Sequence, residues 1–194
     1  MTATPEAKAA LRAELRARRD MFVLDMAPGE RDRHEASVAD HVARLVAGAQ
    51  CVSGYVAIGS ELCCLPVLAA AADAGIATAL PYITRRGEPM RFLRWRLGDP
   101  LEAGPRGLLQ PPADAPELAP DLIVTPLLGF DAGLWRIGQG AGFYDASFAA
   151  MPRAARIGVA WSVQQAAAIP RDPWDVRLHA VVTELGVLKG AEGA

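Results

Sequence analysis

The stretch Arg136-Ile-Gly-Gln-Gly-Ala-Gly-Phe-Tyr-Asp145 places glycine at every second position, between a cation and a carboxylate. Glycines in this spacing interrupt any strand and leave backbone N–H groups without covering side chains. Residues 143–151, which follow, predict a helix. A glycine loop that opens a helix suits a phosphate group, because backbone donors and the positive end of the helix dipole converge there. Asp145, in the first turn, could hold the Mg²⁺ of a nucleoside triphosphate. The alternative is a tight turn with an acid that favours a helix N-terminus.

Strand and helix patterns alternate on both sides of this loop. A helix is expected at 65–74, closed by Gly75. Strands are expected at 51–58, 76–80, 90–95, 121–125 with a continuation at 127–130, 156–161 and 180–184. This alternation predicts a sheet covered by helices. The proline-rich segment 98–120 has little periodicity and is expected to be a long surface loop.

Two helices are predicted before the first strand. Thr4-Pro5 has the form of an N-cap followed by proline at the first helical position, and the helix is expected at 6–24. Its cations recur every three or four residues on one face, at Lys8, Arg12, Arg16 and Arg19. Such a row is either a solvated basic face or the contact surface for an anion. The second helix is expected at 30–47, and residues 1–48 are expected to pack on a single domain that spans 1–194.

Composition excludes several classes of protein. The chain has 194 residues and a formal net charge of −2, so no general attraction to nucleic acid or to an anionic membrane is expected. No apolar run approaches the roughly 18 residues that span a bilayer. The charged N-terminus does not have the pattern of a signal peptide. The three cysteines form neither a disulfide framework nor zinc spacing. A cytoplasmic protein that is a monomer or a weak homodimer is expected.

Familiar nucleotide and hydrolase motifs do not account for the glycine loop. A P-loop needs Gly-Lys-Ser/Thr after its glycines, and the chain has no such sequence. A dinucleotide-binding fingerprint has the spacing G-x-G-x-x-G after a first strand, whereas this loop has G-x-G-x-G and lies late in the chain. The serine-hydrolase elbow G-x-S-x-G is also absent from the sequence.

Four separate pieces of the chain resemble the 5-formyltetrahydrofolate cyclo-ligase family, also called methenyltetrahydrofolate synthetases. They follow one another in the family's order and cover nearly the whole chain. The pieces are Lys8-x-x-Leu11-Arg12, Tyr55-Val-Ala-Ile-Gly-Ser-Glu61, Pro126-Leu-Leu-Gly-Phe-Asp131 with the glycine stretch 136–145, and Trp174-Asp175-Val-Arg-Leu-His179-Ala-Val-Val-Thr-Glu184.

The resemblance implies a three-layer α/β/α fold with a largely parallel central sheet and an N-terminal pair of helices. It also implies an ATP- and Mg²⁺-dependent conversion of 5-formyltetrahydrofolate to 5,10-methenyltetrahydrofolate, with release of ADP and phosphate. In this reaction the formyl oxygen attacks the γ-phosphate to give an N5-iminium phosphate, and N10 then closes the ring. The protein's task in such a phosphoryl transfer is positioning and charge neutralisation.

The family's functional residues are carried over position by position. The residues expected to be catalytic are Lys8, Glu61, Arg136 and Tyr144. Those expected to bind ATP are Lys8, Arg12, Arg136, Ile137, Gly138, Gln139, Gly140, Ala141, Gly142, Phe143 and Tyr144. Those expected to bind the reduced folate are Val56, Glu61, Gln139, Phe143 and Trp161, although Trp161 could equally be a core residue at the end of a strand. Asp145 and Asp175 are expected to hold Mg²⁺.

The chain departs from the family pattern at four positions. Ala141 stands where many relatives have lysine, and Ala146 where arginine is frequent. Trp174 replaces a frequent histidine, and His179 an acidic residue. Two cations near the phosphates are therefore missing. This leaves two alternatives open: a paralogue of the same fold in thiamine-related metabolism, and a folate- or nucleotide-binding regulator without catalysis. Retention of both Asp145 and Asp175 favours an enzyme.

Overall fold

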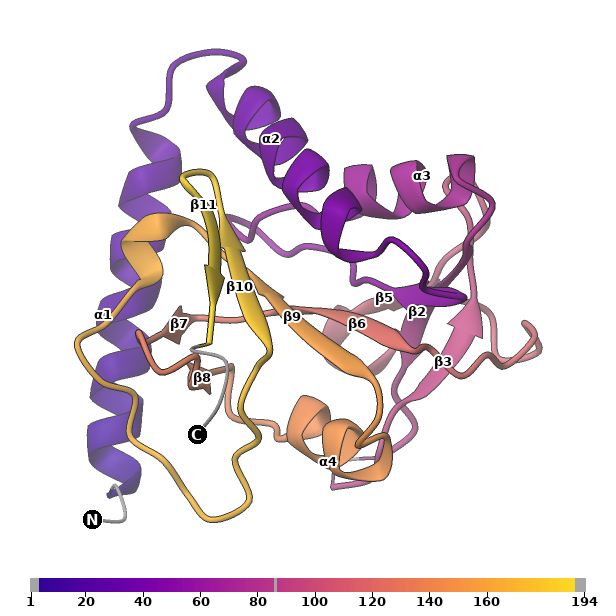
Figure 1. Ribbon diagram of the computed structural model, residues 1–194. Coiled ribbons are helices and arrows are strands. Elements are labelled where there is room, and N and C mark those ends of the chain that lie inside the picture. Colours follow the sequence, from indigo (N-terminus) through magenta and orange to yellow (C-terminus); the bar gives the residue numbers. More distant parts are fainter. Residues whose placement is uncertain (1–3, 86, 191–194) are drawn as a thin grey trace.

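A seven-stranded sheet runs through the middle of the protein, with helices on both of its faces (Figure 1). This computed structural model describes residues 4–85 and 87–190. The strand order is β11-β10-β9-β6-β1-β2-β3. The strands are β1 (Cys51–Ser53), β2 (Ala77–Tyr82), β3 (Arg91–Arg94), β6 (Leu122–Pro126), β9 (Ala155–Val159), β10 (Ala180–Thr183) and β11 (Gly186–Lys189). All neighbours from β10 to β2 are parallel, and only the edge strands β3 and β11 pair antiparallel. The predicted, largely parallel α/β sheet is confirmed.

Side chains of the central strands alternate between two cores because successive residues of a strand point to opposite faces. In β6, Leu122 and Val124 belong to the core beneath α2 (Glu30–Leu45) and α3 (Leu65–Asp73). Ile123, between them, belongs to the core on the opposite face, together with Phe148 of α4 (Phe143–Ala150). The layers are therefore α2 and α3, the sheet, and α4 (Figure 1).

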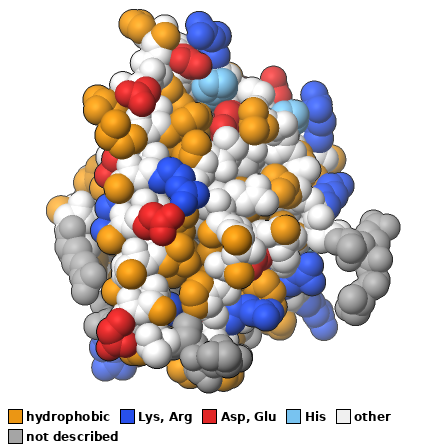
Figure 2. Space-filling model, turned by 90° about the vertical axis from the view of Figure 1, so that its left-hand side faces the viewer, with side chains coloured by type: hydrophobic (Ala, Val, Ile, Leu, Met, Phe, Trp, Pro, Cys, Tyr) orange, Lys and Arg blue, Asp and Glu red, His pale blue; other side chains and the backbone are white. Residues whose placement is uncertain are grey.

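The first helix, α1 (Pro5–Leu24), begins as predicted, because the Thr4 side chain accepts a hydrogen bond from the backbone N–H of Ala7 at 3.2 Å. It lies along one side of the molecule (Figure 1), and Leu15 anchors it in a small core of its own. The expected N-terminal pair is thus divided between two places: α2 is part of a helical layer, and α1 flanks the sheet. On the face shown in Figure 2, basic and acidic side chains are interspersed with hydrophobic ones.

The structure differs from the strand predictions in three places. Residues 54–58 do not continue the strand: β1 ends at Ser53, and the Gly54 N–H makes one further hydrogen bond to the carbonyl of Ala79 at 3.1 Å. The expected continuation at 127–130 is wrong. Proline has no N–H to extend a ladder, so β6 ends at Pro126. Strand β11 was not predicted.

Two short hairpins occupy the segments that lie outside the main sheet. β7 (Gly129–Phe130) pairs with β8 (Arg136–Ile137). The expected long loop, 98–120, contains β4 (Glu102–Ala103), the single turn η1 (Pro105–Gly107) and β5 (Leu109–Gln110), which folds back on β4. Within the described residues, none of the helices has the length and apolar character needed to cross a bilayer.

Candidate active site

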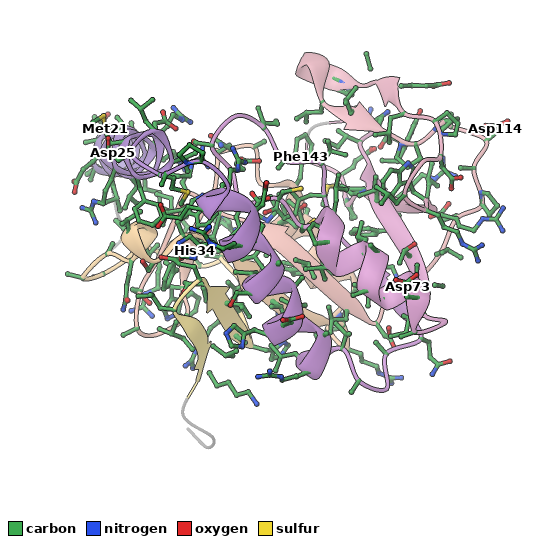
Figure 3. The ribbon with its side chains drawn as sticks, turned by 90° about the horizontal axis from the view of Figure 1, so that it is seen from above. Met21, Asp25, His34, Asp73, Asp114 and Phe143 are labelled. Atoms are coloured by element: carbon green, nitrogen blue, oxygen red, sulfur yellow. The ribbon has the colours of Figure 1, made fainter. Side chains whose placement is uncertain are left out.

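A cavity of about 580 Å³ lies between α1, the glycine loop 138–142 and β5. In Figure 3, Phe143 is labelled between α1, seen end-on, and the loop that carries Asp114. The cavity brings together every residue that the sequence predicted for the site except Trp161. These residues are Lys8, Arg12, Val56, Glu61, the whole of 136–145 without interruption, and Asp175.

The approach to the glycine loop is fixed by Asp131, a residue of the sequence motif that does not line the cavity. One oxygen of its carboxylate accepts the N–H of Trp135 at 3.1 Å, and the other accepts the N–H of Ile169 at 2.9 Å. The turn between Asp131 and Trp135 passes through Leu134, which adopts a positive φ of 63°. β8 then delivers Arg136 to the base of the cavity, where this side chain is buried.

Two of the three alternating glycines are required by the backbone. Gly140 and Gly142 have φ values of 95° and 76°, in the region that residues with a Cβ rarely adopt. A Cβ on Gly140 would also lie 3.3 Å from Cζ of Arg12. The loop can therefore lie directly beneath the guanidinium of α1. Gly142 ends the loop as the first residue outside α4.

The middle of the basic row of α1 faces this loop. Arg12 Nε donates to the carbonyl of Gly138 at 2.9 Å, and Arg16 donates to the side chain of Gln139. Arg19 is 4% exposed, and the Lys8 side chain is 11% exposed. Of the four cations in this row, only Arg16 is exposed. The alternative interpretation, a solvated basic face, is therefore wrong for the other three.

Lys8 lies between two carboxylates of the segment that precedes β10. Its Nζ is 2.7 Å from Oδ2 of Asp172 and 2.9 Å from Oδ2 of Asp175. Burial lowers the pKa of the ammonium group, but the two acids outweigh burial and raise the pKa of Lys8 above its ordinary value. Asp172 was not predicted as a site residue. Its spacing of three from Asp175, in one irregular segment, is the signal that could have identified it.

The second predicted metal ligand, Asp145, also has a basic partner. Its Oδ1 is 2.9 Å from Nη2 of Arg136 and accepts the N–H of Val176 at 3.2 Å. The Arg136 guanidinium lies 5.1 Å from the ring centre of Phe148. Among the residues that the structure describes, the buried Nε of Arg136 has no hydrogen-bond partner.

Glu61 lies at the opposite end of the cavity. One of its oxygens, Oε2, accepts the N–H of Ile58 at 3.1 Å. The other, Oε1, accepts a hydrogen bond from Gln139 at 3.3 Å and lies 3.7 Å from Nη1 of Arg19. The predicted folate residues Glu61 and Gln139 are thus in contact. Burial raises the pKa of Tyr144, which shares this cavity, well above its ordinary value, so its hydroxyl stays protonated at neutral pH.

Two aromatic residues correct the sequence interpretation. Trp161 is fully buried, lies 5.8 Å from the ring of Phe22 and donates from its indole nitrogen to the carbonyl of Ser60 at 2.9 Å. Trp161 does not line the cavity. The interpretation of Trp161 as a core residue therefore fits the structure, and the interpretation as a folate contact does not. Trp174, in contrast, lines the cavity and is 68% exposed. His179 lies outside the cavity against Arg156, with Nδ1 accepting the Arg156 N–H at 2.9 Å.

Asp145 and Asp175 fit a shared Mg²⁺ by their chemistry. Within the described residues, all their polar contacts use one oxygen each, Oδ1 of Asp145 and Oδ2 of Asp175. This leaves the other oxygen of each carboxylate for a ligand. The part of the chain that the structure describes contains no group of three or more acidic, histidine or cysteine side chains arranged around a metal. Mg²⁺ commonly takes only one or two carboxylates, together with substrate phosphates and water.

The chain matches one protein family over most of its length. Residues 4–184 match the model of the 5-formyltetrahydrofolate cyclo-ligase family. Proteins named 5-formyltetrahydrofolate cyclo-ligase from Escherichia coli K12 and Mycolicibacterium smegmatis are 28% and 31% identical, over 70% and 68% of this chain and 78% and 72% of theirs. One from Haemophilus influenzae is 31% identical over 47% of this chain and 52% of its own length.

Solved structures show the same fold. The Aquifex aeolicus 5,10-methenyltetrahydrofolate synthetase superimposes with a TM-score of 0.76 at 25% identity and covers 95% of both chains. The Mycoplasma pneumoniae 5,10-methenyltetrahydrofolate synthetase gives a TM-score of 0.71 at 19% identity, over 91% of this chain and 98% of that one.

Proposed function

The chain belongs to the 5-formyltetrahydrofolate cyclo-ligase family, a family of enzymes, and we propose that it converts 5-formyltetrahydrofolate to 5,10-methenyltetrahydrofolate with ATP and Mg²⁺, releasing ADP and phosphate. The observation that carries this proposal is the meeting of two distant pieces of sequence in one cavity. Arg12 of α1 contacts Gly138 of the glycine loop at 2.9 Å, across 126 positions of sequence. Cations and uncovered backbone donors on one surface are what a polyphosphate requires.

The charge of the cavity supports a requirement for a divalent cation. Its lining includes three basic side chains, Lys8, Arg12 and Arg136, and four acidic ones, Glu61, Asp145, Asp172 and Asp175. This lining is slightly negative, so a polyphosphate would meet repulsion as well as attraction. When bound, Mg²⁺ would offset the charge of the phosphate oxygens, and Asp145 and Asp175 are the residues that would hold it.

The proposed reaction begins when the formyl oxygen of the folate attacks the γ-phosphorus of ATP and ADP leaves. N10 then attacks the activated carbon of the N5-iminium phosphate and releases its proton to solvent, and inorganic phosphate leaves as the ring closes. Lys8, Arg12 and Arg136 stabilise negative charge on the transferred group, in a site where positioning supplies most of the catalysis.

The other end of the cavity supplies the folate contacts in this proposal. Glu61 and Gln139, held together at 3.3 Å, present an acceptor and a donor to the polar edge of the pterin. Val56 and Phe143 provide apolar surface beside them. Tyr144 keeps its proton because burial raises its pKa, and it therefore acts as a hydrogen-bond donor to the reacting oxygens rather than as a base.

One assay tests the proposal. Purified protein is mixed with 5-formyltetrahydrofolate and ATP, with Mg²⁺ or with a chelator, and both the methenyl chromophore and ADP are recorded. We expect both products in equal amounts, and only when ATP and Mg²⁺ are present together. ADP without the methenyl product would favour the paralogue of thiamine-related metabolism. Binding of nucleotide or folate without turnover would favour the regulator.

A further inference from the structure

Trp174 is the largest apolar side chain that the described part of the cavity leaves open to solvent. It is 68% exposed and lines the cavity at the end that contains Lys8. Leaving an indole in water forgoes much of the free energy that its burial would provide. A large exposed aromatic ring at the mouth of a cavity is typical of a binding contact.

The turn that carries Trp174 is fixed at both of its ends. The N–H of Asp175 donates to the carbonyl of Asp172 at 3.1 Å, and the N–H of Asp172 donates to Oδ2 of Asp175 at 2.7 Å. Both carboxylates bind Lys8 of α1. On the preceding side, the Arg171 guanidinium lies 4.7 Å from the ring centre of Trp135. The backbone beneath Trp174 is therefore held in place, while the indole itself stays open.

We infer that Trp174 is the stacking surface for the adenine ring of ATP. This inference rests on the proposed function, because it takes ATP as the ligand. A base stacks on a flat aromatic side chain without needing specific hydrogen bonds.

The order of residues along α1 favours adenine over the folate ring. Lys8 marks the end at Trp174, Arg12 lies at the glycine loop, and Arg19 marks the end at Glu61. Arg19 lies eleven positions after Lys8, which corresponds to about 16 Å of helix. The cations at Lys8 and Arg12 hold the phosphates in the proposal, and Glu61 holds the pterin. The base, on the far side of the phosphates from the folate, then lies at Trp174.

The end at Glu61 has its own exposed apolar side chain, Ile58, which is 53% exposed and lines the same cavity. Its backbone N–H donates to Glu61 at 3.1 Å, so it belongs to the folate end. Each end of the cavity thus offers apolar surface to one of the two flat ligands. The folate ring therefore has apolar surface at its own end and does not need Trp174. The indole ring of Trp174 cannot contact ligands at both ends of the cavity.

The test is calorimetric binding of MgATP and of magnesium inorganic triphosphate, without folate, to the native protein and to three variants. Trp174→Ala should raise the Kd for ATP about tenfold, which corresponds to about 1.4 kcal/mol, and leave the Kd for triphosphate unchanged. Trp174→Phe keeps a flat ring, so its Kd for ATP should lie between those of the native protein and Trp174→Ala. Leu185→Ala, which truncates a side chain that is 81% exposed outside this cavity, should change neither.

The inference is overturned if Trp174→Ala binds ATP as the native protein does, or weakens triphosphate and ATP equally. It is also overturned if a separate titration with 5-formyltetrahydrofolate shows that Trp174→Ala weakens folate binding and leaves ATP binding unchanged. Its failure is distinguishable from that of the proposed function. If the protein forms the methenyl product and Trp174→Ala does not change ATP binding, only this inference is wrong. If ATP binding depends on Trp174 but no methenyl product forms, only the proposed function is wrong. A native protein that does not bind ATP removes both.

Discussion

The two ends of α1 each hold a cation, in very different surroundings. At one end, Lys8 has two carboxylate oxygens at 2.7 and 2.9 Å. At the other end, Arg19 donates to Ser60 Oγ at 2.9 Å, but its Nη1 lies 3.7 Å from Glu61 and, within the described residues, has no hydrogen-bond partner. The end at Lys8 is closely paired, and the end at Arg19 is not.

This difference indicates what each end is suited to do. A cation held by two acids contributes to stability but must share its charge with any anion that arrives. A buried donor without a partner costs about 1–3 kcal/mol, and structures retain such a group where a role outweighs the cost. We therefore expect substitutions near Lys8 to affect the nucleotide and metal, and substitutions near Arg19 to affect the folate and the fold.

The largest effect is expected for the acids that face Lys8 and Arg136. Asp175→Asn and Asp145→Asn should each lower the rate about hundredfold or more and shift the Mg²⁺ titration to higher concentrations, with folate affinity unchanged. Asp172→Asn is the matched control, since Asp172 also binds Lys8 but is not a predicted metal ligand. Unchanged Mg²⁺ titrations in both variants would contradict the metal assignment.

Asp145 also allows the alternative of a simple helix-terminus charge to be tested. If it only favours the N-terminus of α4, Asp145→Asn should cost about 0.3–1 kcal/mol of unfolding free energy and little activity. Chemical denaturation of the same variant gives this number. A strongly reduced rate, with the Mg²⁺ titration shifted to higher concentrations, is the result that we expect.

A smaller effect is expected for Lys8→Ala, which removes the cation from the closely paired end. A charge-assisted contact to phosphate is worth roughly 1.5–3 kcal/mol, so the KM for ATP should rise about ten- to hundredfold. The KM for the folate should change far less. Steady-state kinetics with each substrate varied in turn separate the two. An unchanged KM for ATP would mean that Lys8 serves only to hold the turn at Asp172.

The missing family cation sharpens this prediction. Ala141 lines the same cavity, within the glycine loop. Ala141→Lys should recover part of the ATP affinity that Lys8→Ala loses, because its side chain would rise from the loop that cradles the phosphates. The two single variants and the double variant form a thermodynamic cycle that measures the coupling. Additive effects would show that the two positions do not share a ligand.

Arg19→Met tests the other end and should act mainly on stability. It leaves the buried Glu61 without its nearest cation, so the unfolding free energy should fall by about 1–3 kcal/mol. The KM for the folate should rise severalfold while that for ATP stays constant. Arg44→Met, an exposed position on α2, serves as the control. An equal rise in both KM values would remove the distinction between the two ends.

The smallest effect is expected midway along α1. Arg16 is exposed and contacts only the side chain of Gln139 among the described residues. Exposed contacts of this kind contribute little, so Arg16→Ala should change stability by less than about 0.5 kcal/mol and either KM by less than about twofold. Denaturation and kinetics on the same preparation check both. A large change would mean that Gln139 depends on Arg16 for its position.

Local signals in the sequence predicted most of the fold. Thr4-Pro5 predicted the start of α1, and the glycines predicted the loop before α4, because capping and positive φ depend on neighbouring residues alone. The β–α–β alternation predicted the sheet through the period of its apolar residues. The continuation past Pro126 was the local signal that was misread, since proline ends a ladder.

The site was predicted as a set of residues, but not as a set of contacts. By its match to a known pattern, the sequence by itself determined the family and a group of residues that the fold brings into one cavity. Only the tertiary structure decided that Asp172 binds Lys8, that Trp174 is open while Trp161 is buried, and that Arg19 is left near Glu61. Arg19 and Glu61 are 42 positions apart and Lys8 and Asp172 are 164 apart, and at such separations burial and charge depend on packing that no local pattern encodes.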